Sequence, residues 1–286
     1  MIPNVHHCVW AFDLEWAPDP RAGRVLLDLG DDVSDAEVIA AMWKAGGATD
    51  ENPRPFLKLA WCRVLSVAAV QRRVRKDRVE LNLLWLPRNP EDPAENAETT
   101  ILGKFLGAIG QLRPQLVGFN SRGSDLRILI QRAVALGLQA PGFCERPNKP
   151  WEGFDYFARE NPAHIDLMDV LGTWGAKGTV SLNDMSRLSG IPGKLDTDGE
   201  QVADLWMRGE WQKIVRYNCF DAISTYLLWL RLAHFAGHFN SDAYDEEQEN
   251  VRQLLMSLAD TPEGAYLETY FDEWHRLEAI RQAQPR

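Results

Sequence analysis

The sequence contains little cysteine, and none of it is spaced as in a metal or disulfide site. Only four cysteines occur in 286 residues, Cys8, Cys62, Cys144 and Cys219, and no two of them form a Cys-x-x-Cys pair. This spacing disfavours a structural zinc site and a disulfide framework. We therefore expect four buried free thiols and a reducing, cytoplasmic environment.

Long apolar runs are also missing. The most apolar stretch, residues 223–239, is interrupted by Arg231, His234 and His238, and it falls short of the roughly 18 apolar residues that a membrane span requires. Residues 1–12 lack the basic segment, apolar core and small-residue cleavage site of a secretory signal. We expect a protein that is neither secreted nor inserted in a membrane.

Basic residues are fewer than acidic ones. With 31 Lys and Arg against 41 Asp and Glu, the formal net charge is −10. This balance excludes a protein that coats DNA or RNA electrostatically, because contacts between basic side chains and phosphates supply most non-specific affinity. The 45% hydrophobic and 25% charged residues indicate a globular protein with ample core material. We predict a single domain over residues 1–286, with its core at about 7–235.

The order of the expected elements predicts an α/β fold. Strands are predicted over residues 7–16, 59–70, 79–86, 115–120 and 164–170, and helices over 94–112, 125–136, 181–188, 200–208 and 210–234. Three leading strands followed by alternating strands and helices give a mixed sheet with helices on its faces.

Two segments lie outside this core pattern. Residues 17–58 are predicted to form an insertion after the first strand, in which Ser34 and Glu37 make a capping box for a short helix through Trp43. Residues 240–282 are predicted to form a helical C-terminal tail, whose last helix begins at Thr261 and Pro262.

The first strand carries two carboxylates on one face. Asp13 and Glu15 are two residues apart, so their side chains project to the same side while those of Leu14 and Trp16 project to the other. A charged pair on a strand built for burial requires compensation, and a divalent cation is one way to supply it. A salt-bridged pair at a strand end is the alternative interpretation.

Two later segments offer further polar groups. The strand that ends at Asn120 leads into a helix at Asp125, where either Ser124 or Asp125 as helix N-cap is the simpler explanation. Tyr217 and Asp221 lie four residues apart on one face of an otherwise apolar helix. The alternative for this pair is a core tyrosine hydrogen-bonded to a nearby acid.

The three motifs occur in an informative order. Asp-x-Glu on the first strand, Asn-x-x-x-x-Asp at a strand-to-helix turn and Tyr-x-x-x-Asp on a late helix resemble the DEDD 3′-to-5′ exonucleases of ribonuclease H-like fold. The tyrosine version is similar to the proofreading domain of family B DNA polymerases. Four sequence segments resemble the stand-alone predicted exonucleases related to that domain. They are residues 164–171, 181–194, 198–202 and 217–222. The likeness covers about residues 9–232.

The resemblance implies a ribonuclease H-like mixed five-stranded sheet flanked by helices, and it implies a metal site. It places the four metal-binding acids at Asp13, Glu15, Asp125 and Asp221, and a water-orienting tyrosine at Tyr217. The implied cofactors are two divalent cations, Mg²⁺ or Mn²⁺, which prefer hard oxygen ligands. The sequence departs from the family at two positions near the third acid, where Ser124 replaces the usual aromatic residue and Arg127 a residue that is often proline.

Substrate contacts are predicted beside the metal ligands. Leu14, Phe119 and Asn120 are candidates to wedge or stack the terminal base. A basic run over 71–78 is predicted as a hairpin tip, with a phosphate grip and a solvated tip as alternatives. We expect His164 and Asp166 to be structural, because the tyrosine subclass uses no histidine as a base.

These features favour a metal-dependent 3′-to-5′ exonuclease. The expected reaction releases nucleoside monophosphates from single-stranded 3′ ends, with DNA favoured over RNA. The alternatives are a 3′-to-5′ exoribonuclease of the same superfamily and a catalytically idle module that binds nucleic acid or a protein partner. Nothing in the sequence identifies a protein partner.

Overall fold

The fold is built on a mixed five-stranded sheet. The computed structural model describes residues 2–76, 78–149, 151–173, 179–195 and 199–283. The strands are β1 (Cys8–Pro18), β2 (Cys62–Arg75), β3 (Arg78–Leu86), β4 (Gln115–Gly118) and β5 (His164–Asp166), in the order β3-β2-β1-β4-β5. The first three strands pair antiparallel, whereas β4 and β5 join in parallel. The predicted α/β class and five-stranded sheet are confirmed.

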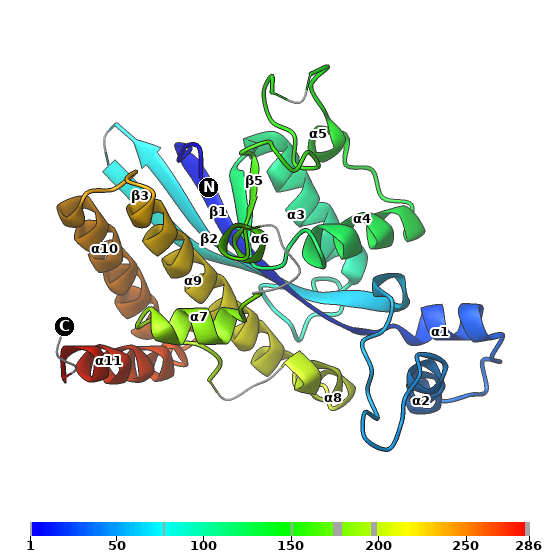
Figure 1. Ribbon diagram of the computed structural model, residues 1–286. Coiled ribbons are helices and arrows are strands. Elements are labelled where there is room, and N and C mark those ends of the chain that lie inside the picture. The colour runs from blue at the N-terminus through cyan, green and yellow to red at the C-terminus, as the bar shows by residue number, and fades with distance from the viewer. Residues whose placement is uncertain (1, 77, 150, 174–178, 196–198, 284–286) are drawn as a thin grey trace.

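Helices cover both faces of this sheet (Figure 1). They are α1 (Pro20–Leu27), α2 (Asp35–Ala45), α3 (Glu98–Leu112), α4 (Asp125–Ala135), α5 (Pro141–Cys144), α6 (Leu167–Leu171), α7 (Leu182–Leu188), α8 (Val202–Met207), α9 (Trp211–Phe235), α10 (Ser241–Ala259) and α11 (Leu267–Ala283). Residues of α9, α10 and α11 share one buried cluster with the sheet, and residues of α3 and α4 share a second. No helix among the described residues has the length and apolar character to cross a membrane.

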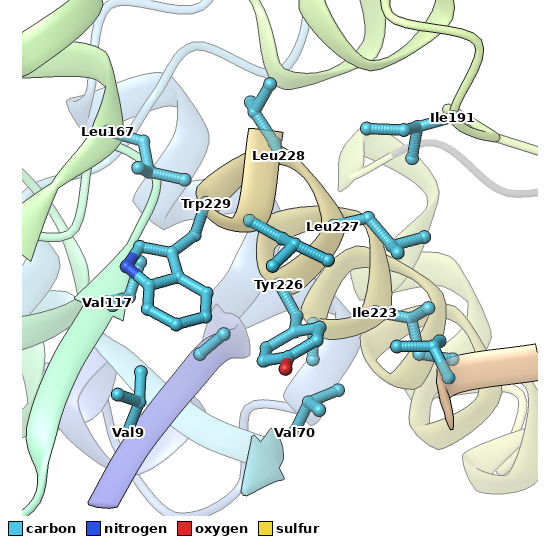
Figure 2. Close-up of a cluster of buried hydrophobic side chains, with 14 of the residues drawn as sticks. Val9, Val70, Val117, Leu167, Ile191, Ile223, Tyr226, Leu227, Leu228 and Trp229 are labelled. Carbon is cyan, nitrogen blue, oxygen red and sulfur yellow. The ribbon is translucent and has the colours of Figure 1, made fainter. Parts of the chain in front are cut away.

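The alternation of β1 divides its side chains between the two clusters. Val9 and Ala11 point to the α9 side, and Figure 2 shows Val9 beneath Trp229 of that helix, with Val70 beneath Tyr226. Trp10, Phe12 and Leu14 belong to the α3 side. Because successive side chains of a strand alternate, Asp13 and Glu15 continue the row of Val9 and Ala11 under α9.

The predicted insertion forms two helices at one end of the sheet (Figure 1). The capping box of Ser34 and Glu37 is present and begins α2, which continues two residues beyond Trp43. Helix α1 was not predicted, although Asp19 accepts a hydrogen bond as its N-cap and Pro20 occupies its first turn. Where the insertion leaves the sheet, the register between β1 and β2 shifts between Glu15 and Trp16.

Some element boundaries differ from the prediction. The fifth strand stops at Asp166 instead of continuing to residue 170, because the Asp166 carboxylate accepts hydrogen bonds from Met168 and Asp169 and begins α6. The last helix begins at Leu267 rather than at Thr261, which lies in a turn before it. Cys144 is exposed, so the expectation of four buried thiols was wrong for this residue.

The basic run lies at the closed end of the β2–β3 hairpin, as predicted. Its residues extend β2 to Arg75 and begin β3 at Arg78, and these two residues pair, so most of the run lies within the strands. Arg72 is buried, and its Nε atom lies 2.9 Å from a carboxylate oxygen of Glu247 in α10. This arginine therefore stabilises the contact between β2 and α10 and has no surface to offer a phosphate.

Candidate active site

Three of the predicted metal ligands lie together between β1 and α9. Carboxylate oxygens of Asp13, Glu15 and Asp221 all lie within 4.8 Å of one another. Asp13 and Glu15 come from one face of β1, and Asp221 comes from the third turn of α9. Glu15 is buried, whereas Asp13 and Asp221 keep some exposed surface. The cluster is therefore closely packed and still open to a small ligand.

Asp125 lies beside this cluster, at the first position of α4. It is 3% exposed, and its Oδ1 atom is buried without a hydrogen-bond partner among the described residues. Burial raises the pKa of Asp125 to about 7. The negative charge of Asp125 also raises the pKa of Asp13.

Ser124 takes the place of the aromatic residue expected before Asp125. Its hydroxyl lies 2.7 Å from Oδ2 of Asp125 and 2.8 Å from the carbonyl oxygen of Asn120. A hydroxyl carries one proton, so it can donate to only one of these oxygens at a time. Ser124 thus offers a hydrogen bond to the Asp125 carboxylate.

The Asp13 carboxylate is held by a residue that was not among the predicted ones. The Asn218 side-chain amide donates to Oδ2 of Asp13 over 2.8 Å, and its carbonyl oxygen accepts from the Ser66 hydroxyl over 3.1 Å. Asn218 and Ser66 are both fully buried. The only sequence signal for this role is a polar residue directly after Tyr217 on an apolar helix.

The carboxylates of the cluster repel one another electrostatically. Burial raises the pKa of Asp13 well above its usual value, and the charges of Asp125, Asp221 and Glu15 raise it further. The hydrogen bond from Asn218 lowers it only in part. Added positive charge would therefore favour the ionised form of Asp13.

Tyr217 forms one wall of the cluster. Its side chain is 5% exposed and packs with Ala17, Leu65 and Ile214. Burial, the nearby carboxylates and a hydrogen bond to Asp221 all raise the pKa of the Tyr217 hydroxyl. The phenol therefore remains protonated at neutral pH and acts as a hydrogen-bond donor.

The predicted substrate residues have different environments. Leu14 is 2% exposed and belongs to the buried cluster on the α3 side, so its side chain has no surface for a base. Phe119 is partly buried against the α9-side cluster. Asn120 has φ of 57°, and its backbone N–H donates to Asp166 over 2.9 Å, at the turn that leads to Asp125.

His164 and Asp166 were expected to be structural. His164 is buried, and its Nε2 atom lies 2.8 Å from the Ser121 hydroxyl. Burial holds the pKa of His164 well below its usual value, so the ring is neutral. Asp166 accepts hydrogen bonds from the backbone N–H groups of Asn120 and Arg122. These contacts fix the loop between β4 and α4.

The side chains of the site fit hard divalent cations. Three carboxylates lie within 4.8 Å of one another, and a fourth, Asp125, has a buried oxygen without a partner among the described residues. Within the same part of the chain, no lysine or arginine forms an ion pair with Asp13 or Asp125. An all-oxygen donor set with excess negative charge is the kind that Mg²⁺ and Mn²⁺ prefer.

The chain is similar to a solved structure at low sequence identity. No curated protein matches it in sequence. Among solved structures, the chain is similar to the family B DNA polymerase from the hyperthermophilic archaeon Pyrobaculum calidifontis, with 15% identity and a TM-score of 0.47. That similarity covers 80% of this chain and 24% of the polymerase chain.

A family model matches most of the sequence. Its description is predicted 3′-5′ exonuclease related to the exonuclease domain of PolB, and the match spans residues 54–274. Asp125, Tyr217 and Asp221 lie inside the match, whereas Asp13 and Glu15 precede it and are linked to the site by the structure alone. The chain belongs to this family of predicted 3′-5′ exonucleases related to the PolB exonuclease domain.

Proposed function

We propose that the protein is a metal-dependent 3′-to-5′ exonuclease that removes nucleoside monophosphates from single-stranded ends, with DNA preferred over RNA. The observation that carries this proposal is the cluster of Asp13, Glu15 and Asp221, whose carboxylate oxygens lie within 4.8 Å of one another beside the buried Asp125. Such a cluster suits phosphodiester hydrolysis by bound divalent ions.

Four carboxylates would hold two divalent ions, Mg²⁺ or Mn²⁺. Asp13, Glu15 and Asp221 form the closer group, and Asp125 would contribute the fourth carboxylate. When bound, the ions would neutralise charge on the phosphate and lower the pKa of a bound water. Asn218 holds Oδ2 of Asp13 in place, so that the carboxylate enters the reaction in a fixed orientation.

Tyr217 would orient the attacking water as a hydrogen-bond donor or acceptor. Its raised pKa argues against a role as an anionic base. Phe119 and Asn120 lie at the strand end next to Asp125 and would contact the terminal nucleotide. Leu14 would contribute through its backbone only, because its side chain is buried.

A nuclease assay tests the proposal. Single-stranded DNA and RNA of matched sequence, labelled at the 5′ end, are incubated with Mg²⁺ or Mn²⁺ and separately with EDTA. We expect a ladder of shortened DNA that requires metal and is abolished in Asp13→Asn. A ladder on RNA alone would favour an exoribonuclease, and no ladder on either polymer would favour a binding module.

A further inference from the structure

A cavity on the far side of α9 from the carboxylates gathers two arginines. It has a volume of about 260 Å³, and Arg88, Gln212 and Arg216 line it together with Trp85 and Tyr266. Gln212 and Arg216 lie one turn apart on α9, Arg88 follows the end of β3, and Tyr266 precedes α11. The cavity is thus built from the core and the C-terminal segment together.

Each arginine rests on an aromatic ring. Cζ of Arg88 lies 3.8 Å from the centroid of the Trp85 ring, and Cζ of Arg216 lies 5.2 Å from that of Tyr266. Both guanidinium charges lower the pKa of the Tyr266 hydroxyl, although burial raises it more, so both arginines lie near this group. Contact with a ring fixes a guanidinium and leaves its N–H groups free at the edge.

The cavity is positively charged in a protein of net charge −10. Neither Arg88 nor Arg216 forms an ion pair with a carboxylate in the part of the chain that the structure describes. Glu263 is the one acidic residue along the cavity among the residues described, so two cations face one anion. Two guanidinium groups directed at one space form a favourable site for a phosphate, which they bind through paired hydrogen bonds.

The aromatic walls of the charged cavity suit a nucleobase. Trp85 pairs with Ala68 on β2, and both belong to the buried cluster on the α9 side, so the Trp85 ring faces the charged cavity. A second cavity, which includes Leu84, Leu86 and Phe105, lies on the α3 side of the sheet and is separate from it. Every base has a flat face that stacks on aromatic rings, so two arginines beside Trp85 and Tyr266 match the chemistry of a nucleotide.

We propose that the charged cavity at the end of β3 binds one nucleotide of the substrate strand upstream of the scissile end. Arg88 and Arg216 hold its phosphate, and its base packs beside Trp85. This inference rests on the proposed nuclease function. Because an α-helix is about 10 Å across, a strand that leaves the carboxylates needs only to cross α9 to reach Arg216.

The salt dependence of strand binding tests the subsite. Arg88→Gln, Arg216→Gln and the double variant are titrated with a labelled oligothymidylate of about 12 nucleotides in EDTA, so that no hydrolysis occurs. We expect each substitution to weaken binding about tenfold at low salt. The slope of log affinity against log salt concentration should fall in magnitude by about 0.7 for each phosphate that the variant no longer neutralises.

Arg21→Gln is the matched control. It removes the same charge from an exposed arginine of α1, outside the proposed site, and its slope should equal that of the unmodified protein. An unchanged slope in the double variant would overturn the proposal. Weaker binding of thymidine monophosphate with unchanged strand binding would also overturn it, since the cavity would then serve a free nucleotide.

The same experiment separates this inference from the nuclease proposal. Binding is measured without metal, so it does not depend on catalysis. Hydrolysis of a dinucleotide, which is too short to reach across α9, should proceed at the unmodified rate in the double variant. A normal subsite in a protein without any nuclease activity would overturn the proposed function and leave the nucleotide site intact.

Discussion

Asp125→Asn should stabilise the metal-free protein while it disables the site. Burial raises the pKa of Asp125 from 3.8 to about 7, so at pH 8 the folded protein carries an ionised carboxylate in an unfavourable environment. The difference between these two values corresponds to about 4 kcal/mol. Asparagine has a similar shape and no charge. After allowance for a weaker hydrogen bond from Ser124, we expect a gain of about 3 kcal/mol in the free energy of unfolding.

The stability of the metal-free protein should depend on pH, and the pKa of Asp125 gives the sign of this dependence. The folded-state pKa of Asp125 lies above that of the unfolded chain, so the folded protein takes up a proton as the pH falls through about 7. The unfolded chain takes up this proton only near pH 4. Stability of the metal-free protein should therefore rise by about 1.4 kcal/mol per pH unit below pH 7 through this group, and Asp125→Asn should lack that contribution.

Urea denaturation in EDTA at pH 8 and at pH 5.5 measures both effects. Asp50→Asn, which changes an exposed carboxylate, is the control and should leave the free energy of unfolding unchanged. Added Mg²⁺ should stabilise the unmodified protein more than the Asp125→Asn variant. If that variant is no more stable than the unmodified protein at pH 8 in EDTA, the electrostatic account of the site is wrong.

Three further substitutions test separate parts of the structure. Asn218→Ala removes the hydrogen bond to Asp13 and should raise the Mg²⁺ concentration for half-maximal activity about tenfold or more. An unchanged Mg²⁺ requirement would refute the positioning role of Asn218. Tyr217→Phe removes only a hydroxyl, so kcat should fall on the order of 100-fold while the melting temperature stays the same; a normal kcat would exclude the tyrosine from catalysis. Glu247→Ala leaves the buried Arg72 without its carboxylate partner and should lower the free energy of unfolding, measured by urea denaturation, by about 3 to 5 kcal/mol. A decrease below about 1 kcal/mol would show that the ion pair contributes little to stability.

The sequence predicted the features that depend on neighbouring residues. Alternation along β1 correctly assigned Asp13 and Glu15 to one face, and the spacing of Ser34 and Glu37 identified the start of α2. Both patterns arise within a few residues, because a strand repeats every two residues and a capping box spans one helical turn.

Features that depend on distant partners could not be predicted in this way. Arg72 belongs to a run of basic residues typical of a surface, but its burial is decided by Glu247, which lies 175 residues further along the chain. Asn218 acquires its role only when α9 docks on the sheet and brings it between Ser66 and Asp13. Local patterns carry no information on how α9 and α10 are oriented against β1 and β2.

Asp166 shows how a residue outside the metal cluster can control it. Its carboxylate binds the backbone N–H groups of Asn120 over 2.9 Å, Arg122 over 2.8 Å and Met168 over 3.0 Å. These hydrogen bonds hold the turn before Asp125 on the edge strand β5, so the turn cannot shift independently of that strand. A substitution at Asp166 would mimic the removal of a metal ligand in kinetic assays, although Asp166 itself need never touch metal or substrate.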